Sequence, residues 1–520
     1  MPSDPSENGK TTPEKGAGTE PPRIGTDEWV AQVASRKRQT RGFSGWLAMR
    51  WERIPLGWRF GMVLSLLILI PLATNTQAFL DLLGISNNAF IVRTATRFLV
   101  FALLAIGLNV VVGYAGLLDL GYVAFYGIAG YLYAYLSSDF VRIGSLGIDG
   151  LHVPALLSIP LIIAVTAMVG WLIGTISLRL SGDYLAIVTL GFGQVFVQLV
   201  LTSTRVRVPW QDRPVNFTRG PNGINRLDDV TLFGYTFEST IQYYYLFLVL
   251  LVLVYIGVRH LNFSRVGRAW RSIREDELAA EVMGAPTGRL KILAFVIGAG
   301  IAALAGSVDA AWQGNVVPVP RYSVLTLINL YAMVVLGGIG SLTGVVIGAF
   351  IFTVLPEVLR SSAVAGVLFY GAGLIGLYFL LKPFKRYALI LIGTVSSGFL
   401  LKFLVLTLLP GLHTGLPEPG SILNQAVQSW LVIPADYKLV GNVVTGLSAL
   451  VLLLTILARQ RPRLFYPLLG ISIYMLAFSW ETRLALEPSA TRILIVGATL
   501  VVLMIVRPHG LLGKPEVRVV

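Results

Sequence analysis

The sequence has few of the residues on which most active sites depend. Its 520 residues include no cysteine and only four histidines, and 13% of them are charged. The lack of cysteine excludes disulfides, thiolate metal sites and cysteine nucleophiles, and four histidines leave little for a metal cluster, so no metal site is predicted. A soluble chain carries about 25% charged residues. The deficit indicates that the solvent of this chain is a lipid bilayer.

A phosphate-binding loop of the form GxxxxGK followed by Ser or Thr is also missing. The glycine-rich stretches 298–306 and 337–344 lie in apolar runs and lack the lysine that would meet a phosphate, so we interpret them as helix-packing segments. We therefore predict that the chain is not an enzyme and binds no cofactor itself. Any ATPase that powers it is expected to be a separate chain.

Long apolar runs make up most of the chain, which is 55% hydrophobic. A helix of roughly 17–25 apolar residues spans the hydrocarbon core of a membrane. Several of the runs are short and rich in glycine, which is typical of broken or re-entrant helices. Hydropathy predicts about fourteen spans, roughly at 60–79, 92–113, 122–137, 153–178, 184–202, 241–258, 292–312, 323–339, 342–359, 365–381, 387–409, 439–458, 464–479 and 492–507.

Basic residues exceed acidic ones and give a formal net charge of +14. They are scattered through short connections between spans, which is typical of cytoplasmic loops under the positive-inside rule rather than of nucleic-acid binding. With the N-terminus inside, alternate crossings put both termini and four basic loops in the cytoplasm: 259–291, 382–386, 459–463 and 507–518. The segment 203–240 has five arginines yet falls outside, because a long loop that also holds four acidic residues can be translocated.

The first 56 residues are polar and are expected to form a cytoplasmic tail. Residues 1–26 are rich in Pro, Gly, Ser, Thr and Glu and are predicted to be disordered, because they cannot bury enough apolar surface. Residues 27–56 combine Trp29 and Val33 with basic residues, which predicts a surface helix on anionic membrane lipid. No cleavable signal peptide is expected, because the apolar stretch begins only after residue 59.

An amphipathic segment at 264–284 lies in the longest internal cytoplasmic stretch and ends in Gly-Ala-Pro. Helical spacing puts Val266, Trp270 and Ile273 on one face. Periodicity leaves two interpretations open: an interfacial helix that only covers the bundle, or a coupling helix through which a nucleotide-driven partner moves the spans. Four arginines before four acids favour coupling, because a lipid-surface helix is more often basic throughout. The candidate coupling residues are Arg265, Arg268, Trp270, Arg271, Ile273, Arg274, Glu275, Glu277 and Gly284.

Two glycine clusters and a few polar residues are candidate hinges or path residues, because small residues let membrane helices approach closely and break. The similar placement of the two clusters hints at an internal repeat. Asp119 is either a hinge contact or part of a solvated turn, and Asp183 is either a path residue or the cap of a helix start. The candidates are Asn109, Gly113, Gly116, Asp119, Gly121, Asp183, Gly191, Gly193, Asp309, Gly337, Gly338 and Gly340.

Charged residues within the spans are few. Asp309 and Glu357 fall within about one turn of the outer ends of their spans and could line an entrance, whereas Lys402 is expected to snorkel toward the outer interface. No charge pair is predicted at mid-depth, where a proton- or sodium-coupled carrier usually needs one. An importer permease is therefore the leading hypothesis, an ion-coupled secondary transporter the second and a passive channel the third.

Six motifs occur in order along the chain: 108–125 (LNVVVGYAGLLDLGYVAF), 180–193 (LSGDYLAIVTLGFG), 220–224 (GPNGI), the helix at 264–284, 335–341 (VLGGIGS) and 507–513 (RPHGLLG). Together they resemble the LivM-type permeases of branched-chain amino acid ABC importers. The resemblance covers roughly residues 90–360 and 490–513, and six ordered motifs make it specific.

The resemblance implies an all-α polytopic membrane protein with a core of about ten helices, paired with a LivH-type second permease. It also implies two cytoplasmic ATPase subunits that bind ATP and Mg, a periplasmic substrate-binding protein and residence in the bacterial inner membrane. The implied cargo is branched-chain or related amino acids. Related permeases move urea or short amides, so these substrates stay open.

The chain departs from the family pattern mainly at 361–486, which intervenes before the last span and contains four of the candidate spans. An even number of extra crossings preserves a cytoplasmic C-terminus and leaves ten core spans, so we interpret this stretch as an insertion. The predicted parts are therefore a tail at 1–56, a core at 57–360, an insert at 361–486 and the last core helix with the C-terminus at 487–520. Arg219 and His509 stand where the family commonly has Gly and Gln.

Overall fold

The computed structural model describes residues 61, 65, 67–72, 88–143, 148–177, 182–206, 216–359, 362–381, 384–408, 422–434, 436–458, 461–484, 495, 497, 498, 501, 504 and 510–513. Met1–Ile70 and Pro71–Val520 form separate compact units. The predicted tail at 1–56 and His509 lie outside the described residues, as do most of the spans predicted at 60–79 and 492–507.

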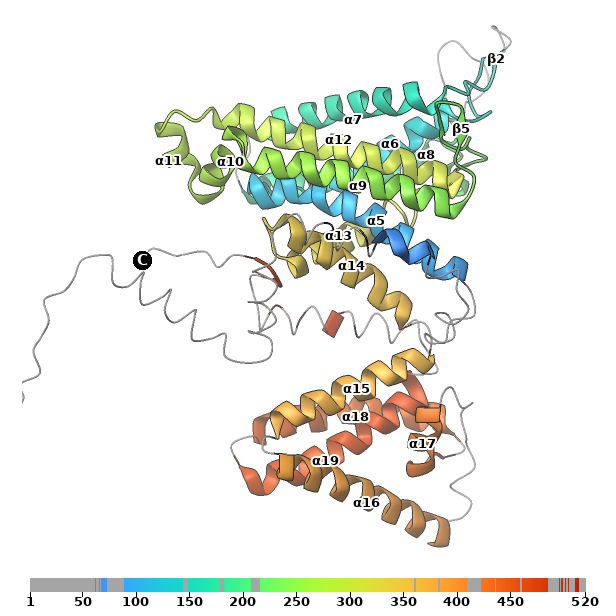
Figure 1. The fold of residues 1–520 in the computed structure, drawn as a ribbon, viewed down its shortest axis with the longest axis vertical. Helices are drawn as coiled ribbons and strands as arrows, with labels where there is room; N and C mark the ends of the chain where they lie inside the picture. Colours follow the sequence, from blue (N-terminus) through green and yellow to red (C-terminus); the bar gives the residue numbers. More distant parts are fainter. Residues whose placement is uncertain are drawn as a thin grey trace, which may run out of the picture. The chain divides into compact units, whose positions relative to one another are not determined.

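The first helical bundle contains the family motifs up to residue 341 (Figure 1). Its main helices are α5 (Asn88–Leu108) with its π-helical end η1 (Asn109–Tyr114), α6 (Tyr122–Leu136), α7 (Ala155–Ser177), α8 (Asp183–Thr202), α9 (Thr240–Phe263), α12 (Thr287–Gln313), α13 (Val324–Gly337) and α14 (Leu342–Val358). Among the described residues, eight helices of the chain are long and apolar enough to cross a membrane, and three shorter apolar helices accompany them. The prediction of an all-α polytopic membrane protein is confirmed.

Small residues allow α12 to lie at the centre of this bundle, against α5, α6 and α7. A Cβ on Gly306 would come within 2.5 Å of the Tyr126 backbone oxygen, and one on Gly170 would meet Ala299 at 2.6 Å. Because there is no room for larger side chains, the backbones of these helices approach closely. The glycines of 298–306 therefore serve packing, as the sequence indicated.

Short antiparallel strand pairs cover the end of this bundle that lies opposite α10 and α11 (Figure 1). They are β1 (Arg142–Ile143) with β2 (Ile148–Asp149), β3 (Ile224–Asn225) with β6 (Asn315–Val316), and β4 (Thr231–Leu232) with β5 (Tyr235–Thr236). Arg219 precedes the 3₁₀ turn η3 (Gly220–Asn222) with φ of +56°, a conformation that favours glycine. A glycine would adopt this backbone conformation with less strain than Arg219 does.

A second bundle follows α14 and contains α15 (Ser362–Leu380), α16 (Phe384–Leu408), α18 (Tyr437–Leu457) and α19 (Pro462–Ser479) with its π-helical end η6 (Trp480–Leu484). These helices coincide with the four spans predicted at 361–486. A fifth helix, α17 (Ile422–Trp430), is too short to span and was not predicted. The Lys402 Nζ donates to the Ser429 carbonyl of α17 at 2.7 Å, and its placement at the outer interface stays a prediction.

The second bundle has a buried carboxylate at its polar centre, which the sequence analysis missed. Glu481 of η6 accepts hydrogen bonds from the Tyr370 hydroxyl at 2.8 Å and the Gln428 amide at 2.9 Å. Phe369 stacks on the neighbouring Trp480, with ring centroids 4.2 Å apart. These contacts join α15, α17 and η6, since a buried carboxylate needs donors around it.

Candidate functional site

The segment 264–284 forms two helices rather than the single helix predicted, namely α10 (Arg265–Glu275) and α11 (Glu277–Val282). The break lies at Asp276, whose backbone is extended and whose carboxylate accepts the Ala279 N–H at 3.0 Å. Aspartate is a strong N-cap residue because its side chain satisfies a free N–H of a starting helix. A new helix therefore begins where the pattern predicted that the first would continue.

The predicted apolar face of α10 packs against the bundle. Trp270 and Ile273 are buried, and the Trp270 indole N–H donates to the Leu290 carbonyl in α12 at 2.8 Å. Lys291 and Glu277 form an ion pair between α12 and α11. Val266 is partly buried. These contacts fix α10 and α11 to the first turns of α12.

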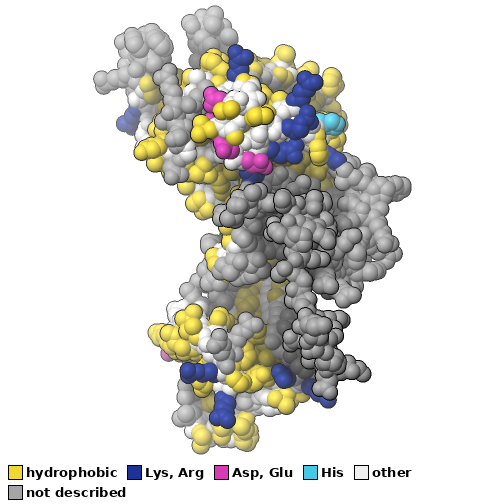
Figure 2. Space-filling model, turned by 90° about the vertical axis from the view of Figure 1, so that its left-hand side faces the viewer, with side chains coloured by type: hydrophobic (Ala, Val, Ile, Leu, Met, Phe, Trp, Pro, Cys, Tyr) yellow, Lys and Arg dark blue, Asp and Glu magenta, His cyan; other side chains and the backbone are white. Residues whose placement is uncertain are grey.

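The opposite surface of α10 and α11 is exposed and combines charge with apolar side chains. Arg265, Arg268 and Glu275 are exposed, and Val282 and Met283 are each 87% exposed, next to the exposed Gly284. The end of the first bundle that carries α10 and α11 shows acidic, basic and hydrophobic side chains together (Figure 2). Arg268 donates to the Phe263 carbonyl at 3.0 Å and Arg271 to the Asn262 carbonyl at 3.2 Å, so both cap the end of α9.

The two glycine clusters meet at one place. The Asn109 amide oxygen in η1 accepts the Gly340 N–H of the turn between α13 and α14, at 2.9 Å. A Cβ on Gly113 would overlap the Asn109 side chain and lie 2.7 Å from the Gly340 nitrogen. The Arg274 guanidinium donates to the Gly113 carbonyl at 2.7 Å. Asn109, Gly113 and Gly340, predicted separately as hinge residues, thus form one junction with α10.

Asp119 is buried, which excludes the solvated-turn alternative. Its Oδ1 accepts the Gly121 N–H at 2.9 Å, and its backbone oxygen accepts the Tyr331 hydroxyl of α13 at 2.6 Å. The neighbouring Leu120 N–H donates to Thr189 of α8 at 2.9 Å. The break between η1 and α6 is therefore held by contacts to α8 and α13.

Gly337 and Gly338 lie where α13 ends and the C-terminal motif returns to the core. The N–H groups of Leu511 and Leu512 donate to the carbonyls of Leu336 and Gly337 at 2.9 and 3.1 Å. A Cβ on Gly510 would lie 2.6 Å from the Gly338 Cα. The last motif of the resemblance thus satisfies free carbonyls at the end of α13.

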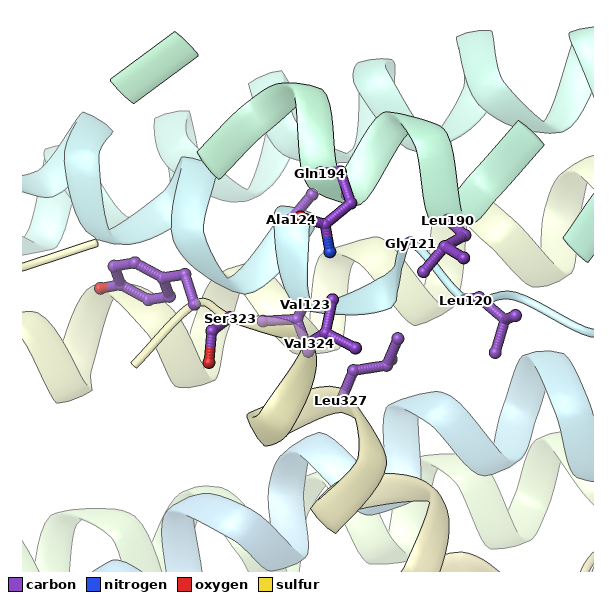
Figure 3. Close-up of a pocket in the computed structure, with 11 residues that line it drawn as sticks. Leu120, Gly121, Val123, Ala124, Leu190, Gln194, Ser323, Val324 and Leu327 are labelled. Carbon is purple, nitrogen blue, oxygen red and sulfur yellow. The ribbon is translucent and has the colours of Figure 1, made fainter. Parts of the chain in front are cut away.

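A small, mostly apolar pocket opens between α6, α8 and the start of α13 (Figure 3). Gly121 and Gly193 line it, and Gln194 and Ser323 supply its polar atoms. Gly191 lies two residues before Gly193 on α8, and a Cβ there would meet nothing within 4 Å. The structure thus brings Gly121 and Gly193 together and leaves Gly191 on an open surface.

The predicted entrance residues differ in their surroundings. Asp309 is buried rather than exposed at a mouth, and its carboxylate accepts the Tyr126 hydroxyl and lies 4.0 Å from the Arg321 Nε. Glu357 is partly buried at the end of α14. Asp183 is the first residue of α8, whose N-cap is Gly182, and its side chain lies outside the described residues.

The sequence analysis did not find Tyr126, Arg321 or Glu481. Arg321 lies in a connection with no helical or strand periodicity, and its partner Asp309 is on another element. In the sequence, nothing distinguishes Tyr126 from the other aromatic residues of α6. The only available signal was a charged residue within a span, and of the residues in this cluster it identified only Asp309.

Comparison with known proteins assigns the family. The family model described as "Branched-chain amino acid transport system / permease component" matches residues 90–393, which is more than half of the chain. The chain belongs to this family of permeases. It is accordingly a transport permease subunit and a multi-pass membrane protein. The match extends through α15 into α16, and the insert boundaries at 361 and 486 stay predictions.

Named relatives agree with this assignment. The high-affinity branched-chain amino acid transport system permease protein LivM of Salmonella typhimurium is 36% identical over 56% of this chain and 68% of its own length. The LivH protein of Escherichia coli is 28% identical over 50% of this chain and 82% of its own length. The BraD protein of Pseudomonas aeruginosa is 28% identical over 49% and 80%. No solved structure matches the chain.

Proposed function

We propose that this chain is one of two pore-forming subunits of an ATP-driven importer that moves branched-chain amino acids across the bacterial inner membrane. A LivH-type permease, two cytoplasmic ATPases that bind ATP and Mg, and a periplasmic substrate-binding protein complete the importer. Both termini of this chain are cytoplasmic. The proposal rests on the family membership and on the names of the relatives.

The observation that carries the proposal is the surface of α10 and α11. Trp270 anchors this helix pair to α12, whereas Leu278, Val282 and Met283 are exposed at 75%, 87% and 87%. An exposed apolar patch with a charged rim is typical of a protein interface. The sequence contains no phosphate-binding loop, so this surface is the proposed docking site of the separate ATPase.

The proposed translocation path runs along α8. Gln194 and Gln198 are exposed on a helix that also exposes Gly191, and the pocket of Figure 3 adjoins this face. Amide side chains are costly in contact with lipid tails, so this face is better explained by a polar path shared with the second permease. Neutral amides and backbone dipoles suit a zwitterionic cargo, while selectivity is assigned to the binding protein.

The test is reconstitution of this chain with a LivH-type permease, the ATPases and the binding protein in liposomes. ATP-dependent uptake of labelled leucine, with competition by isoleucine and valine but not by urea or acetamide, is the expected result. Competition by urea or acetamide would instead indicate the amide alternative. Uptake by the permease pair alone, driven by a proton or sodium gradient, would indicate a secondary transporter and overturn the proposal.

The docking surface has its own test. Leu278→Glu places a charge in the exposed patch, touches no buried contact, and is expected to lower ATP-dependent uptake about tenfold by weakening ATPase binding. Co-purification of the ATPase with the permease pair measures that binding. Normal co-purification and uptake would show that the ATPase docks elsewhere.

A further inference from the structure

Arg274 occupies the junction between α10 and the two glycine breaks. It lies in the last turn of α10 and is partly buried. Its Nη1 donates to the Gly113 carbonyl in η1 at 2.7 Å, across 161 positions of sequence. A cation at the carbonyl end of a helix is favourable because it meets oxygens that the helix leaves without donors.

Two glycines make room for this side chain. Gly116 has φ of +72°, and a Cβ there would lie 3.0 Å from the Arg274 Cγ and 3.2 Å from its Cβ. Gly340 has φ of +82°, and a Cβ there would lie 2.7 Å from the Arg274 Nη1. The aliphatic part of the Arg274 side chain therefore packs on Gly116, and its guanidinium packs on Gly340.

Asn109 joins the two glycine-containing segments directly. Its amide oxygen accepts the Gly340 N–H at 2.9 Å, so η1 and the turn between α13 and α14 are bonded to each other as well as to α10. Trp270, one turn earlier, fixes α10 to α12. A displacement of α10 thus acts on α12 through Trp270 and on both breaks through Arg274.

We propose that Arg274 is the positioning residue that transmits movement of α10 to the hinges at Gly113–Gly116 and Gly338–Gly340. The inference rests on the proposed function, because it requires a partner that moves α10. Arg274 is partly buried against η1, whereas the proposed docking patch consists of the exposed side chains of Leu278, Val282 and Met283. Loss of Arg274 uncouples ATP hydrolysis from transport and leaves docking intact.

The experiment compares Arg274→Gln, Arg274→Lys and Gly340→Ala with wild type and with Arg386→Gln in the reconstituted importer. Arg386 is an exposed cation at the start of α16 and serves as the matched control. The ratio of substrate taken up to ATP hydrolysed is expected to fall about tenfold in Arg274→Gln. Arg274→Lys retains the charge and is expected to fall less, and Gly340→Ala displaces the guanidinium and behaves like Arg274→Gln.

Unchanged ratios in Arg274→Gln and Gly340→Ala would overturn the inference. So would failure of both Arg274 variants to assemble, because Arg274 would then serve folding rather than transmission. Uptake by the wild-type importer tests the proposed function separately. If the wild-type importer transports another amino acid or an amide, the cargo assignment fails. The ratio is then measured with that cargo and still decides the role of Arg274.

Discussion

At the scale of single residues, the functional surface depends on a few side chains that satisfy backbone groups of other elements. Trp270 donates to the Leu290 carbonyl, Arg274 to the Gly113 carbonyl and Arg271 to the Asn262 carbonyl. Each donor reaches an oxygen near a helix end or within the first turn of a helix. Loss of such a donor leaves a polar group without its partner, which is costly in a low-dielectric interior.

Replacement of Trp270 by Phe tests one of these contacts. The substitution removes the indole N–H that the Leu290 carbonyl accepts at 2.8 Å, and it also leaves a cavity because Phe is smaller than Trp. We expect a loss of about 1–3 kcal/mol in stability. Thermal unfolding of the detergent-purified chain measures it, with Arg386→Gln as the control. Equal melting temperatures for the two variants would contradict the role of the indole N–H.

His152 makes the loop near β1 and β2 sensitive to pH. Its Nδ1 lies 2.8 Å from Asp228 and its Nε2 lies 2.9 Å from Asp139. The hydrogen bonds to Asp228 and Asp139 raise the pKa of His152 above its usual 6.5. A raised folded-state pKa means that protonation favours the folded loop. This contribution is complete below about pH 6.5 and is lost as the pH rises through the raised pKa.

We therefore expect amide hydrogen exchange at 139–143 and 148–152, corrected for the intrinsic pH effect, to be slower at pH 5.5 than at pH 8 in wild type. His152→Asn should remove this difference, because an amide cannot acquire the proton. A pH dependence that survives in His152→Asn would assign it to other groups.

At the scale of elements, close helix packing at glycine decides which hairpins form. In the hairpin of α13 and α14, a Cβ on Gly348 would overlap the Met333 backbone oxygen, and one on Gly344 would overlap the Gly337 oxygen. Gly376, Gly393 and Gly446, in α15, α16 and α18, are different, since a Cβ on any of them meets nothing within 4 Å. The same residue type is therefore required in one bundle and dispensable at these positions of the other.

Gly348→Ala and Gly446→Ala form a matched pair. Gly348→Ala should separate α13 from α14 and lower the yield of assembled, folded chain. Gly446→Ala fills open space and should be neutral or stabilising by about 0.5–1 kcal/mol, because Ala suits a helix better than Gly. Yield and melting temperature after size-exclusion chromatography provide the measurement. Similar losses in both variants would show that a helical methyl group, rather than the close contact, is responsible.

At the scale of the whole molecule, the chain leaves the first bundle after α14, forms α15–α19 and returns to the end of α13 at Gly510–Leu512. The C-terminal motif therefore contacts the first bundle, while the interpretation of 361–486 as an insertion stays a prediction. Deletion of 361–486 with measurement of assembly and uptake would distinguish a scaffold role from an interface with another subunit.

The return contact can be tested without removing the insert. Gly510 has φ of +75°, and a Cβ there would lie 2.5 Å from the Val335 oxygen, so Gly510→Ala should detach the segment. Leu512→Ala retains the N–H that bonds to Gly337 and serves as the control, because the Leu512 side chain is half exposed. A lower melting temperature is expected for Gly510→Ala only. Equal stability of the two variants would mean that the contact contributes little.

Local sequence patterns predicted several features correctly. Long apolar runs located the helices from α5 to α19 apart from α10, α11 and α17, and the spacing of Trp270 and Ile273 identified the buried face of α10. Apolar runs and helical spacing both depend on residues at most a few turns apart, so both can be recognised directly in the sequence. The helix break at Asp276 was not predicted, because the amphipathic pattern continues across it. The Asp276 side chain acts as an N-cap and starts a second helix there.

The sequence by itself determined that this chain is a polytopic membrane protein with an amphipathic segment at 264–284 and no phosphate-binding loop, because hydropathy, periodicity and motifs are properties of neighbouring residues. Only the tertiary structure decided which residues meet. Arg274 reaches Gly113 across 161 positions, and Asn109 reaches Gly340 across 231. Such contacts arise from how α10, α13 and η1 pack, and packing depends on the shapes of all the surfaces involved rather than on any local pattern.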